Sequence, residues 1–319
     1  MDWKSLLKSQ GYLVADGAMG TELAARGLAA GAPPEAWNLE RPEAVADVSR
    51  AYVEAGAQVL LTNTFGGTRW KLARSGLADR TAAVNRAAVE AARRGAGRSA
   101  GRSADRSAGR ALVFASIGPT GELVAPLGPR EPAEFVAVFA EQVAACAAAG
   151  ADGVCIETMT ALEEALAALA AARQAAPGLP AVVSMTFDRG AKTVATVMGV
   201  RPEQAAQALD EAGADLVGSN CGDGIEGHIE VARRLRSATR RPVWIKSNAG
   251  RPELVAGRTV FRQTPEAMAG HVAALLAAGA NVVGGCCGTT PEHIRAIAAA
   301  ARAARATALE AGRDVLDAL

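Results

Sequence analysis

The sequence is poor in aromatic residues and has no surplus of charge of either sign. Phenylalanine, tyrosine and tryptophan make up 4% of the 319 residues, whereas apolar residues of all kinds make up 50%. A core can therefore be built, mainly from aliphatic side chains, and global disorder is excluded. The 34 basic and 33 acidic side chains leave a formal net charge of +1. This balance favours neither a nucleic-acid partner nor a membrane surface.

Long apolar runs and an even set of cysteines are also missing. Charged or amide side chains interrupt the alanine-rich stretches, so we expect no transmembrane helix. Residues 1–5 do not open a secretory signal, because no apolar stretch with a cleavage site follows them. Cysteine occurs five times, at positions 146, 155, 221, 286 and 287. An odd number in a long chain argues against a disulfide framework. We therefore expect a cytoplasmic protein whose thiols serve a metal or catalysis.

A short repeat organises the chain. The triplet Ala-Gly-Ala occurs at 55–57, 149–151, 212–214 and 278–280, each time after a helix-like pattern and before a short apolar run. Glycine suits the position just past a helix, where the backbone is left-handed. The runs that follow are rich in β-branched residues, as is typical of parallel strands covered on both faces. They predict strands at 58–64, 152–158, 215–220 and 281–285.

Four further strands complete a regular alternation. They are predicted at 12–16, 112–117, 181–187 and 242–248. Helical patterns separate the strands, at 43–55, 79–94, 132–149, 161–175, 202–211, 225–239 and 266–278, and a last helix begins near Pro291 with Thr290 as its N-cap. Eight strands alternating with helices predict a (β/α)8 barrel, a TIM barrel, as a single domain over residues 1–319.

One segment breaks this pattern. Residues 95–110 read GAGRSAGRSADRSAGR and contain no apolar anchor. We expect a flexible, exposed loop between the second helix and the third strand, because added loop length costs little stability. Its arginines would suit RNA or an acidic partner, but a tolerated loop expansion is the preferred interpretation.

Three cysteines fall at the end of the barrel where active sites lie, the C-terminal ends of the strands. Cys221 follows the sixth strand, and Cys286 and Cys287 follow the eighth. At about 5 Å per strand these two strands lie about 10 Å apart, so side chains that lean inward can meet over the barrel axis. Three thiolates at about 2.3 Å would hold Zn²⁺ and leave a fourth position open, as in catalytic zinc sites. For Cys146 and Cys155 we expect only the packing role of a small apolar residue.

Five motifs at the strand ends occur in a fixed order. They are Asp-Gly-Ala-Met-Gly-Thr at 16–21, Thr-Asn-Thr-Phe at 62–65, Gly-Pro-Thr-Gly at 118–121, Asn-Cys-Gly at 220–222 and Gly-Gly-Cys-Cys-Gly-Thr-Thr-Pro at 284–291. Over residues 10–303 the chain resembles the zinc-dependent homocysteine S-methyltransferase family, and within it the homocysteine-binding module of cobalamin-dependent methionine synthase. The resemblance implies methyl transfer to the thiol of L-homocysteine, which gives L-methionine, with Zn²⁺ bound by Cys221, Cys286 and Cys287.

The resemblance also assigns substrate contacts. Asp16, Gly17 and Glu157 match the groups that hold the amino-acid end of homocysteine, and Glu157 would pair with its α-ammonium group. The alternative for Glu157 is a buried carboxylate that a neighbouring residue satisfies. Asn248 matches a residue able to occupy the fourth zinc position before substrate arrives. Thr64 lies on the same rim and is assigned to the substrate as well. Zinc suits this chemistry because a free alkyl thiol has a pKa near about 8.5, whereas a coordinated thiol is deprotonated and nucleophilic.

The methyl donor stays open at this point. Relatives that use betaine surround its quaternary ammonium group with aromatic rings. This chain carries Gly66 and Thr158 where that branch carries tyrosines, which leaves Trp37 or Trp70 to compensate. The chain is too short for appended cobalamin modules and has no Asp-x-His-x-x-Gly signature. Methylcobalamin would therefore be delivered by a separate corrinoid protein, and the sulfonium compounds S-methylmethionine and S-adenosylmethionine are the other candidates.

Two rival functions remain. The glycine-rich loop at 284–288 would also suit phosphate in a barrel lyase or aldolase, with Lys246 as the Schiff-base candidate. A zinc-dependent sensor or chaperone would bind homocysteine or a corrinoid protein without turnover. None of the three histidines is needed as a ligand. We expect His228 and His271 to be surface or packing residues, and His293 to lie in the first turn of the last helix.

Overall fold

Eight parallel strands form the central sheet of the computed structural model, which describes residues 2–97, 111–189, 194–255 and 258–310. Their order in space is β1-β12-β9-β8-β5-β4-β3-β2. The strands are β1 (Leu13–Val14), β2 (Val59–Leu61), β3 (Leu112–Ile117), β4 (Gly153–Met159), β5 (Ala181–Met185), β8 (Leu216–Cys221), β9 (Val243–Ser247) and β12 (Ala280–Gly285). A parallel bridge from Ala15 to Val59 joins the two ends of this order and closes the barrel. The predicted (β/α)8 barrel is confirmed.

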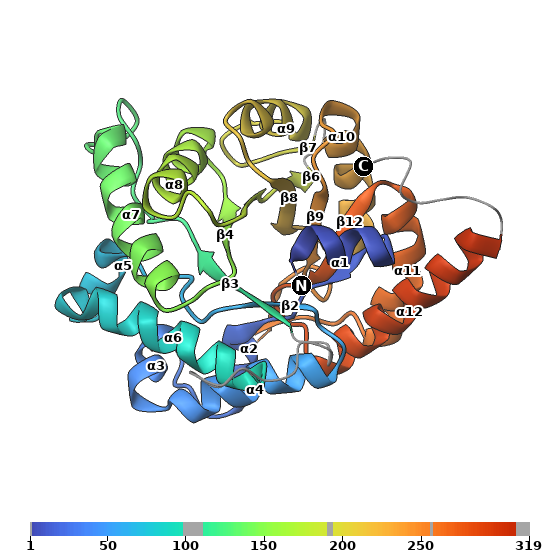
Figure 1. Cartoon of the computed structure of the whole chain (residues 1–319), viewed down its shortest axis with the longest axis horizontal. Helices are drawn as coiled ribbons and strands as arrows, with labels where there is room; N and C mark the ends of the chain where they lie inside the picture. Colours follow the sequence, from blue (N-terminus) through green and yellow to red (C-terminus); the bar gives the residue numbers. More distant parts are fainter. Residues whose placement is uncertain (1, 98–110, 190–193, 256–257, 311–319) are drawn as a thin grey trace.

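Helices surround the strands on the outside (Figure 1). In chain order they are α2 (Met19–Ala25), α3 (Trp37–Glu40), α4 (Pro42–Glu54), α5 (Arg69–Ala73), α6 (Thr81–Gly95), α7 (Pro132–Ala148), α8 (Leu162–Ala175), α9 (Pro202–Glu211), α10 (Ile225–Ala238), α11 (Pro265–Ala277) and α12 (Pro291–Glu310), with short 3-10 turns at Pro34–Ala36 and Ala78–Arg80. None of the described helices is both long and apolar enough to cross a membrane.

The Ala-Gly-Ala repeat ends four helices, as predicted. Gly56, Gly150, Gly213 and Gly279 have φ angles of 104°, 89°, 85° and 103°. Each follows the last turn of α4, α7, α9 or α11 and adopts the left-handed backbone that side-chain-bearing residues rarely reach. The strand that begins directly afterwards is β2, β4, β8 or β12.

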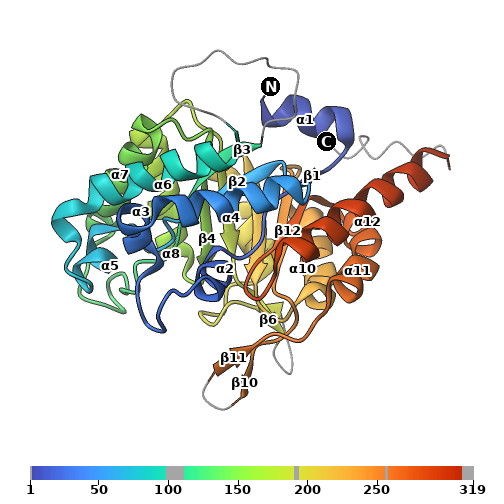
Figure 2. The same cartoon turned by 90° about the horizontal axis from the view of Figure 1, so that it is seen from below.

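The interior of the barrel is apolar at its N-terminal end. Trp244 of β9 stacks on Phe114 of β3, with ring centroids 6.4 Å apart. The first helix, α1 (Trp3–Gln10), contributes Trp3 and Leu7 to the same interior cluster. Figure 2 shows α1 at the end of the barrel opposite the β10–β11 hairpin (Glu253–Val255 and Arg258–Val260). The amino-terminal segment therefore closes the bottom of the barrel, a role that the sequence pattern did not predict.

Two short hairpins extend the C-terminal end of the barrel. One pairs β6 (Asp188–Arg189) with β7 (Val194–Ala195) after β5, and the other is the β10–β11 hairpin after β9. Neither was predicted, because each is only two or three residues long on either side. Of the predicted 95–110 loop, residues 98–110 lie outside the described residues, and α6 ends at Gly95.

Leu7→Ala tests the plug at the bottom of the barrel. Leu7 is 2% exposed, and truncating a buried leucine leaves a cavity that costs about 2–5 kcal/mol. We expect the free energy of unfolding in urea to fall by this amount, while Lys8→Ala, on the exposed face of the same helix, changes it by less than about 0.5 kcal/mol. Equal stability of the two variants would show that α1 does not seal the barrel.

Candidate metal and substrate site

Three sulfur atoms meet above the barrel axis. The Sγ atoms of Cys221, Cys286 and Cys287 lie within 4.8 Å of one another, and those of Cys221 and Cys287 are 4.0 Å apart. Zn–S bonds of about 2.3 Å in a tetrahedral site separate the sulfurs by about 3.8 Å, so this spacing suits one ion. Among the described residues these three form the one group of three or more histidine, cysteine or carboxylate side chains with such a spacing. All five cysteines are free thiols.

The backbone around the cysteines is held in an uncommon shape. Cys221 ends β8 with a φ of 67°, a left-handed conformation that is rare for residues other than glycine and is often found at functional sites. The N–H of Cys286 donates to the carbonyl of Ser247 at 2.8 Å, and the Thr289 hydroxyl donates to the carbonyl of Cys286 at 2.7 Å. Gly285 is needed here, because a Cβ atom at this position would lie 2.3 Å from Thr289 Oγ1.

The three thiols share negative charge. Hydrogen bonds from Cys286 and then Cys287 lower the pKa of the Cys221 thiol to about 3, and burial opposes this effect. In turn, the hydrogen bond to Cys221 raises the pKa of Cys287 far above its usual range. These opposite shifts favour ionisation of Cys221 over that of Cys286 and Cys287. Such a site suits a thiophilic cation, whose binding would release the remaining thiol protons to the solvent.

Asn248 lies beside Cys221 and has an unpaired oxygen atom. Its Nδ2 atom donates to the carbonyl of Gly222 at 3.0 Å, whereas its Oδ1 atom is buried without a hydrogen-bond partner. An unpaired buried carbonyl oxygen is costly, so native proteins rarely leave one without a use. Three sulfurs and one exchangeable oxygen form a donor set that fits a catalytic zinc ion.

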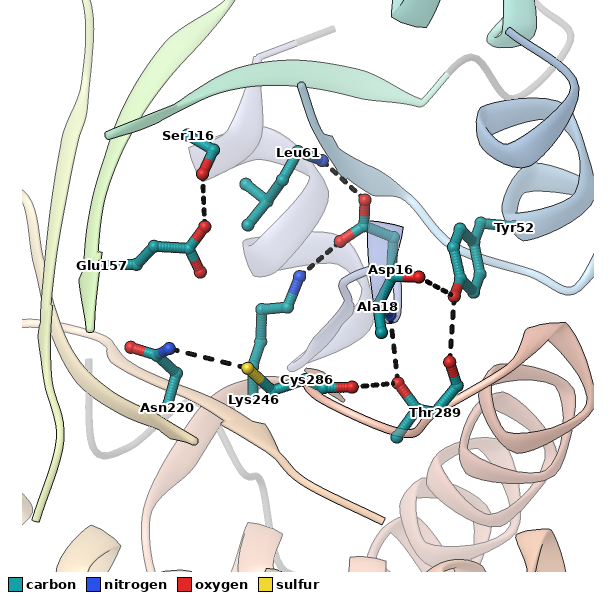
Figure 3. Close-up of polar contacts among 10 residues, drawn as sticks. All are labelled: Asp16, Ala18, Tyr52, Leu61, Ser116, Glu157, Asn220, Lys246, Cys286 and Thr289. Carbon is teal, nitrogen blue, oxygen red and sulfur yellow. Dashed lines mark hydrogen bonds and ion pairs between the residues drawn. The ribbon is translucent and has the colours of Figure 1, made fainter. Parts of the chain in front are cut away.

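A buried ion pair forms the floor of the site, on the N-terminal side of the sulfurs along β9, and Figure 3 shows this pair beside Cys286. Asp16, which follows β1, pairs through Oδ1 with the ammonium group of Lys246 on β9, and both side chains are 3% exposed. Its Oδ2 atom accepts from the N–H of Leu61 at 2.7 Å. Burial alone would lower the pKa of Lys246, but Asp16 and Glu157 outweigh burial and raise it. Lys246 is therefore an ammonium ion rather than the neutral amine that a Schiff base requires, and the aldolase alternative loses its candidate.

Glu157 lies across the floor from this pair. Its Oε1 atom accepts a 2.5 Å hydrogen bond from the Ser116 hydroxyl, and its second oxygen points away from Ser116 (Figure 3). Burial raises the pKa of Glu157 to about 7, while Lys246 acts in the opposite direction. Glu157 thus has a neighbour that satisfies one oxygen, and the carboxylate also lines a cavity together with the three cysteines.

Asn220 joins the sulfur cluster to the neighbouring strands, a role that the sequence analysis missed. Its Oδ1 atom accepts from Ser184 Oγ at 2.7 Å and from the N–H of Thr158 at 2.8 Å. Its Nδ2 atom donates to Thr158 Oγ1 at 2.7 Å and to Cys286 Sγ at 3.7 Å. The position of Asn220 beside Cys221 in a motif was the only available signal, because all of these partners are remote in the sequence.

The loop after β1 is fastened to the loop that carries the paired cysteines. The N–H of Ala18 donates to Thr289 Oγ1 at 3.2 Å, and the Tyr52 hydroxyl lies 3.1 Å from the carbonyl oxygens of both Ala18 and Thr289 (Figure 3). Between them, Gly17 leaves no room for a side chain, since a Cβ atom there would lie 2.7 Å from the Tyr52 hydroxyl. A shift of either loop would therefore move the other.

The structure also shows the surroundings of three further predicted residues, Thr64, Cys146 and Cys155. Thr64 is fully buried and donates to the carbonyl of Ser116 at 2.7 Å, while its neighbours Asn63 and Phe65 line the cavity; its substrate role stays a prediction. Cys146 and Cys155 are fully buried, as their packing role requires. Burial raises the pKa of the Cys146 thiol to about 12.

The histidines lie outside the sulfur cluster. His228 is buried between the hydroxyls of Ser219 and Ser247, at 3.0 and 2.9 Å, and burial lowers its pKa to about 4. It is thus a neutral packing residue behind the ends of β8 and β9. His271 pairs with Glu226 at 3.1 Å, and His293 contacts the carbonyl of Gln263 at 2.9 Å.

The cavity beside the sulfurs has a volume of about 460 Å³, and a single aromatic residue lines it among the described residues. Phe65 is the aromatic residue of its lining, and the Lys71 ammonium group lies 4.7 Å from the centre of that ring. Trp37 and Trp70, which could replace the tyrosines of betaine-using relatives, contact other side chains instead. Trp37 is covered by the Arg41 guanidinium at 4.3 Å, and Trp70 packs against Phe135 with centroids 5.2 Å apart.

Comparison with known proteins agrees with this geometry. A family model described as homocysteine S-methyltransferase matches residues 13–301. The chain belongs to the homocysteine S-methyltransferase family. A methionine synthase of Mycobacterium tuberculosis is 34% identical over 305 residues, which cover 92% of this chain and 25% of that protein. The methionine synthase of Mycobacterium leprae is 33% identical, with 24% of its length covered. This member of the family thus spans about a quarter of these curated relatives.

A solved structure has nearly the same extent as this methyltransferase family member. The crystal structure of the homocysteine methyltransferase MmuM from Escherichia coli, in its metallated form, superposes with a TM-score of 0.77 at 28% identity. The match covers 93% of this chain and 98% of that one. The oxidized form of the same protein matches equally well.

Gly285→Ala tests whether the glycine shapes the sulfur cluster of this family member. The added methyl group would push Thr289 away from Cys286, and overpacking of this kind costs about 1–3 kcal/mol. We expect zinc affinity, measured by competition with a chromophoric chelator, to fall about tenfold or more. Gly270→Ala on α11, where a methyl group meets open space, is the matched control and should bind zinc as the parent does. Unchanged affinity in Gly285→Ala would contradict this role.

The buried carboxyl of Glu157 makes stability depend on pH. Because its pKa is raised from the usual 4.5 to about 7, the folded chain holds an extra proton between these values. Its contribution to the free energy of unfolding therefore falls as pH rises from 4.5 to 7. We expect the metal-free parent to lose at least about 1 kcal/mol relative to Glu157→Gln over this interval, measured by urea unfolding in reductant. A difference that does not change with pH would show that Glu157 is ionised throughout.

Proposed function

We propose that this chain transfers a methyl group to the thiol of L-homocysteine, giving L-methionine, with Zn²⁺ bound by Cys221, Cys286 and Cys287. The observation that carries this proposal is the meeting of three sulfur atoms beside a cavity whose floor is charged. Family membership supports homocysteine as the acceptor. Free thiols at all five cysteines suit a reducing compartment, and we place the protein in the cytoplasm.

Different residues would bind the thiol end and the amino-acid end of the substrate. The cysteine sulfurs would hold the metal, and the Asn248 carbonyl would fill its fourth position until the substrate thiol displaces it. Bound zinc would keep that thiol as its thiolate, the nucleophilic form, at neutral pH. Glu157 would pair with the α-ammonium group, and Asp16 and Gly17 would shape the seat of the amino-acid end. Thr64 is kept as a further substrate contact.

The surroundings of the cavity bear on the methyl donor. Seven of the eight exposed large apolar side chains in the described part of the chain lie in segments that follow barrel strands at their C-terminal ends: Phe65, Leu123, Leu127, Val197, Met198, Leu254 and Val255. Exposed apolar side chains at the end of the barrel that carries the site favour docking of a macromolecule. We propose methylcobalamin on a separate corrinoid protein as the donor, with a free sulfonium compound as the second candidate. Betaine is disfavoured, because Phe65 is the single aromatic residue among the described residues that line the cavity.

The direct test supplies the zinc-loaded chain with homocysteine and each donor in turn. The donors are a methylated corrinoid protein, S-methylmethionine, S-adenosylmethionine and betaine, and methionine is quantified by mass spectrometry. Methionine formation with at least one donor is expected. Zinc and homocysteine binding without methionine from any donor would instead support a sensor.

Cys221→Ala tests the ligand assignment. Removing one of three sulfurs should reduce bound zinc from about one per chain to a small fraction and abolish methionine formation together with it. Cys146→Ala, which removes a buried thiol outside the cluster, should keep both zinc and turnover. Metal content by atomic emission and turnover are measured on the same preparations. Full zinc occupancy and full turnover in Cys221→Ala would refute the assignment.

A further inference from the structure

Lys246 is a charged residue in the middle of an apolar strand. On the inward face of β9 it follows Trp244, which packs in the apolar bottom of the barrel, and precedes Asn248 at the sulfur cluster. The Lys246 side chain is buried at 3% exposure and lines the same cavity as the three cysteines. Taking an ammonium group out of water is costly, and apolar residues of similar volume usually stabilise a core at least as well as a buried ion pair does. A buried lysine at the floor of a cavity therefore indicates that its ammonium group contacts a bound ligand.

The ion pair changes what each carboxylate can offer a substrate. Both oxygens of Asp16 already have a donor, Lys246 on Oδ1 and the N–H of Leu61 on Oδ2. Glu157 gives one oxygen to Ser116, and its other oxygen points away from that residue (Figure 3). Glu157 is thus better placed than Asp16 to accept an α-ammonium group. The Lys246 ammonium group has three N–H donors. Asp16 Oδ1 accepts a hydrogen bond from this group on one side.

The position of Lys246 along the barrel axis also suits contact with a substrate whose thiol is held at the sulfur cluster. It pairs in register with Asn220 on β8 and with Gly284 on β12, while the next residue, Ser247, pairs with Cys221 and Gly285. The lysine therefore starts one residue below the level of the sulfurs, and its charge acts on Cys286. The carboxylate of a thiol amino acid such as homocysteine is separated from its sulfur by only a few bonds. A thiol held at the sulfur cluster brings such a carboxylate to the floor.

We propose that Lys246 is a substrate-contacting specificity residue: held by Asp16, its ammonium group binds the α-carboxylate of the thiol substrate while Glu157 binds the α-ammonium. The inference rests on the proposed function and narrows its substrate class to thiols that carry both charges. Asp16 acts through Lys246 in this arrangement and is a positioning residue. The substrate carboxylate in turn gives the buried lysine a second counter-charge.

The test compares thiols that differ by one charged group. Calorimetry measures the Kd of the zinc-loaded chain for homocysteine, for 3-aminopropane-1-thiol, which lacks the carboxylate, and for 4-mercaptobutanoate, which lacks the amine. The parent should prefer homocysteine to the aminothiol by roughly 10- to 100-fold, the effect of a hydrogen bond between charged groups. In Lys246→Met this preference should fall to about twofold or less, with little change in affinity for the aminothiol.

Glu157→Gln is the matched control for the other charge. It should lose the preference for homocysteine over 4-mercaptobutanoate and keep the preference over the aminothiol. Because Lys246→Met leaves Asp16 as an unpaired buried charge, the double variant D16N/K246M is measured as well. It removes both members of the pair and should show the same loss of carboxylate preference.

The outcomes separate this inference from the proposed function. If Lys246→Met and the double variant weaken binding of homocysteine and the aminothiol by the same factor, Lys246 only supports the floor and the inference is overturned. A carboxylate preference that survives in both variants overturns it as well. If the zinc-loaded parent binds none of the three thiols, the proposed function fails and the inference with it.

Discussion

Gathering three thiols within 4.8 Å of one another is the constraint on which the rest of this structure depends. Sulfurs that would all be ionised repel each other, so they stay together only when protons or a cation offset their charge. The barrel brings them together from β8 and β12, which lie on either side of β9. A left-handed backbone at Cys221 and a glycine at 285 then turn the sulfurs toward one point. The surrounding hydrogen bonds, from Asn220 and Thr289, fix these turns rather than adding ligands.

The interior changes character along the barrel axis, and this order sets what the site can bind. Trp3, Leu7 and Trp244 close the bottom with apolar groups, so the layer above them does not open toward this end of the barrel. That layer holds the Lys246–Asp16 pair and Glu157, whose charges act strongly on each other because they are buried. The sulfurs form the top layer and open to the cavity. A substrate with a thiol at one end and charges at the other matches this sequence of layers.

The sequence predicted the barrel well because its signals are local. Short β-branched runs after Ala-Gly-Ala triplets mark parallel strands, and the strand ends then place Cys221 and the Cys286–Cys287 pair on one rim. The missed features depend on partners remote in the chain. The helix that contains Trp3 and Leu7 looks like any short amphipathic segment until the barrel interior is known. Lys246 and Asp16 are separated by 230 residues, and the side chain of Asn220 contacts four groups on three other segments. Composition and periodicity carry no record of such contacts.

Counting the sulfur atoms around the bound metal tests the central claim most directly. X-ray absorption at the zinc edge of the loaded chain should show three sulfurs and one oxygen or nitrogen ligand, at Zn–S distances of about 2.3 Å. Addition of homocysteine should change this count to four sulfurs. Two or fewer sulfurs, or a coordination shell that homocysteine leaves unchanged, would contradict the account.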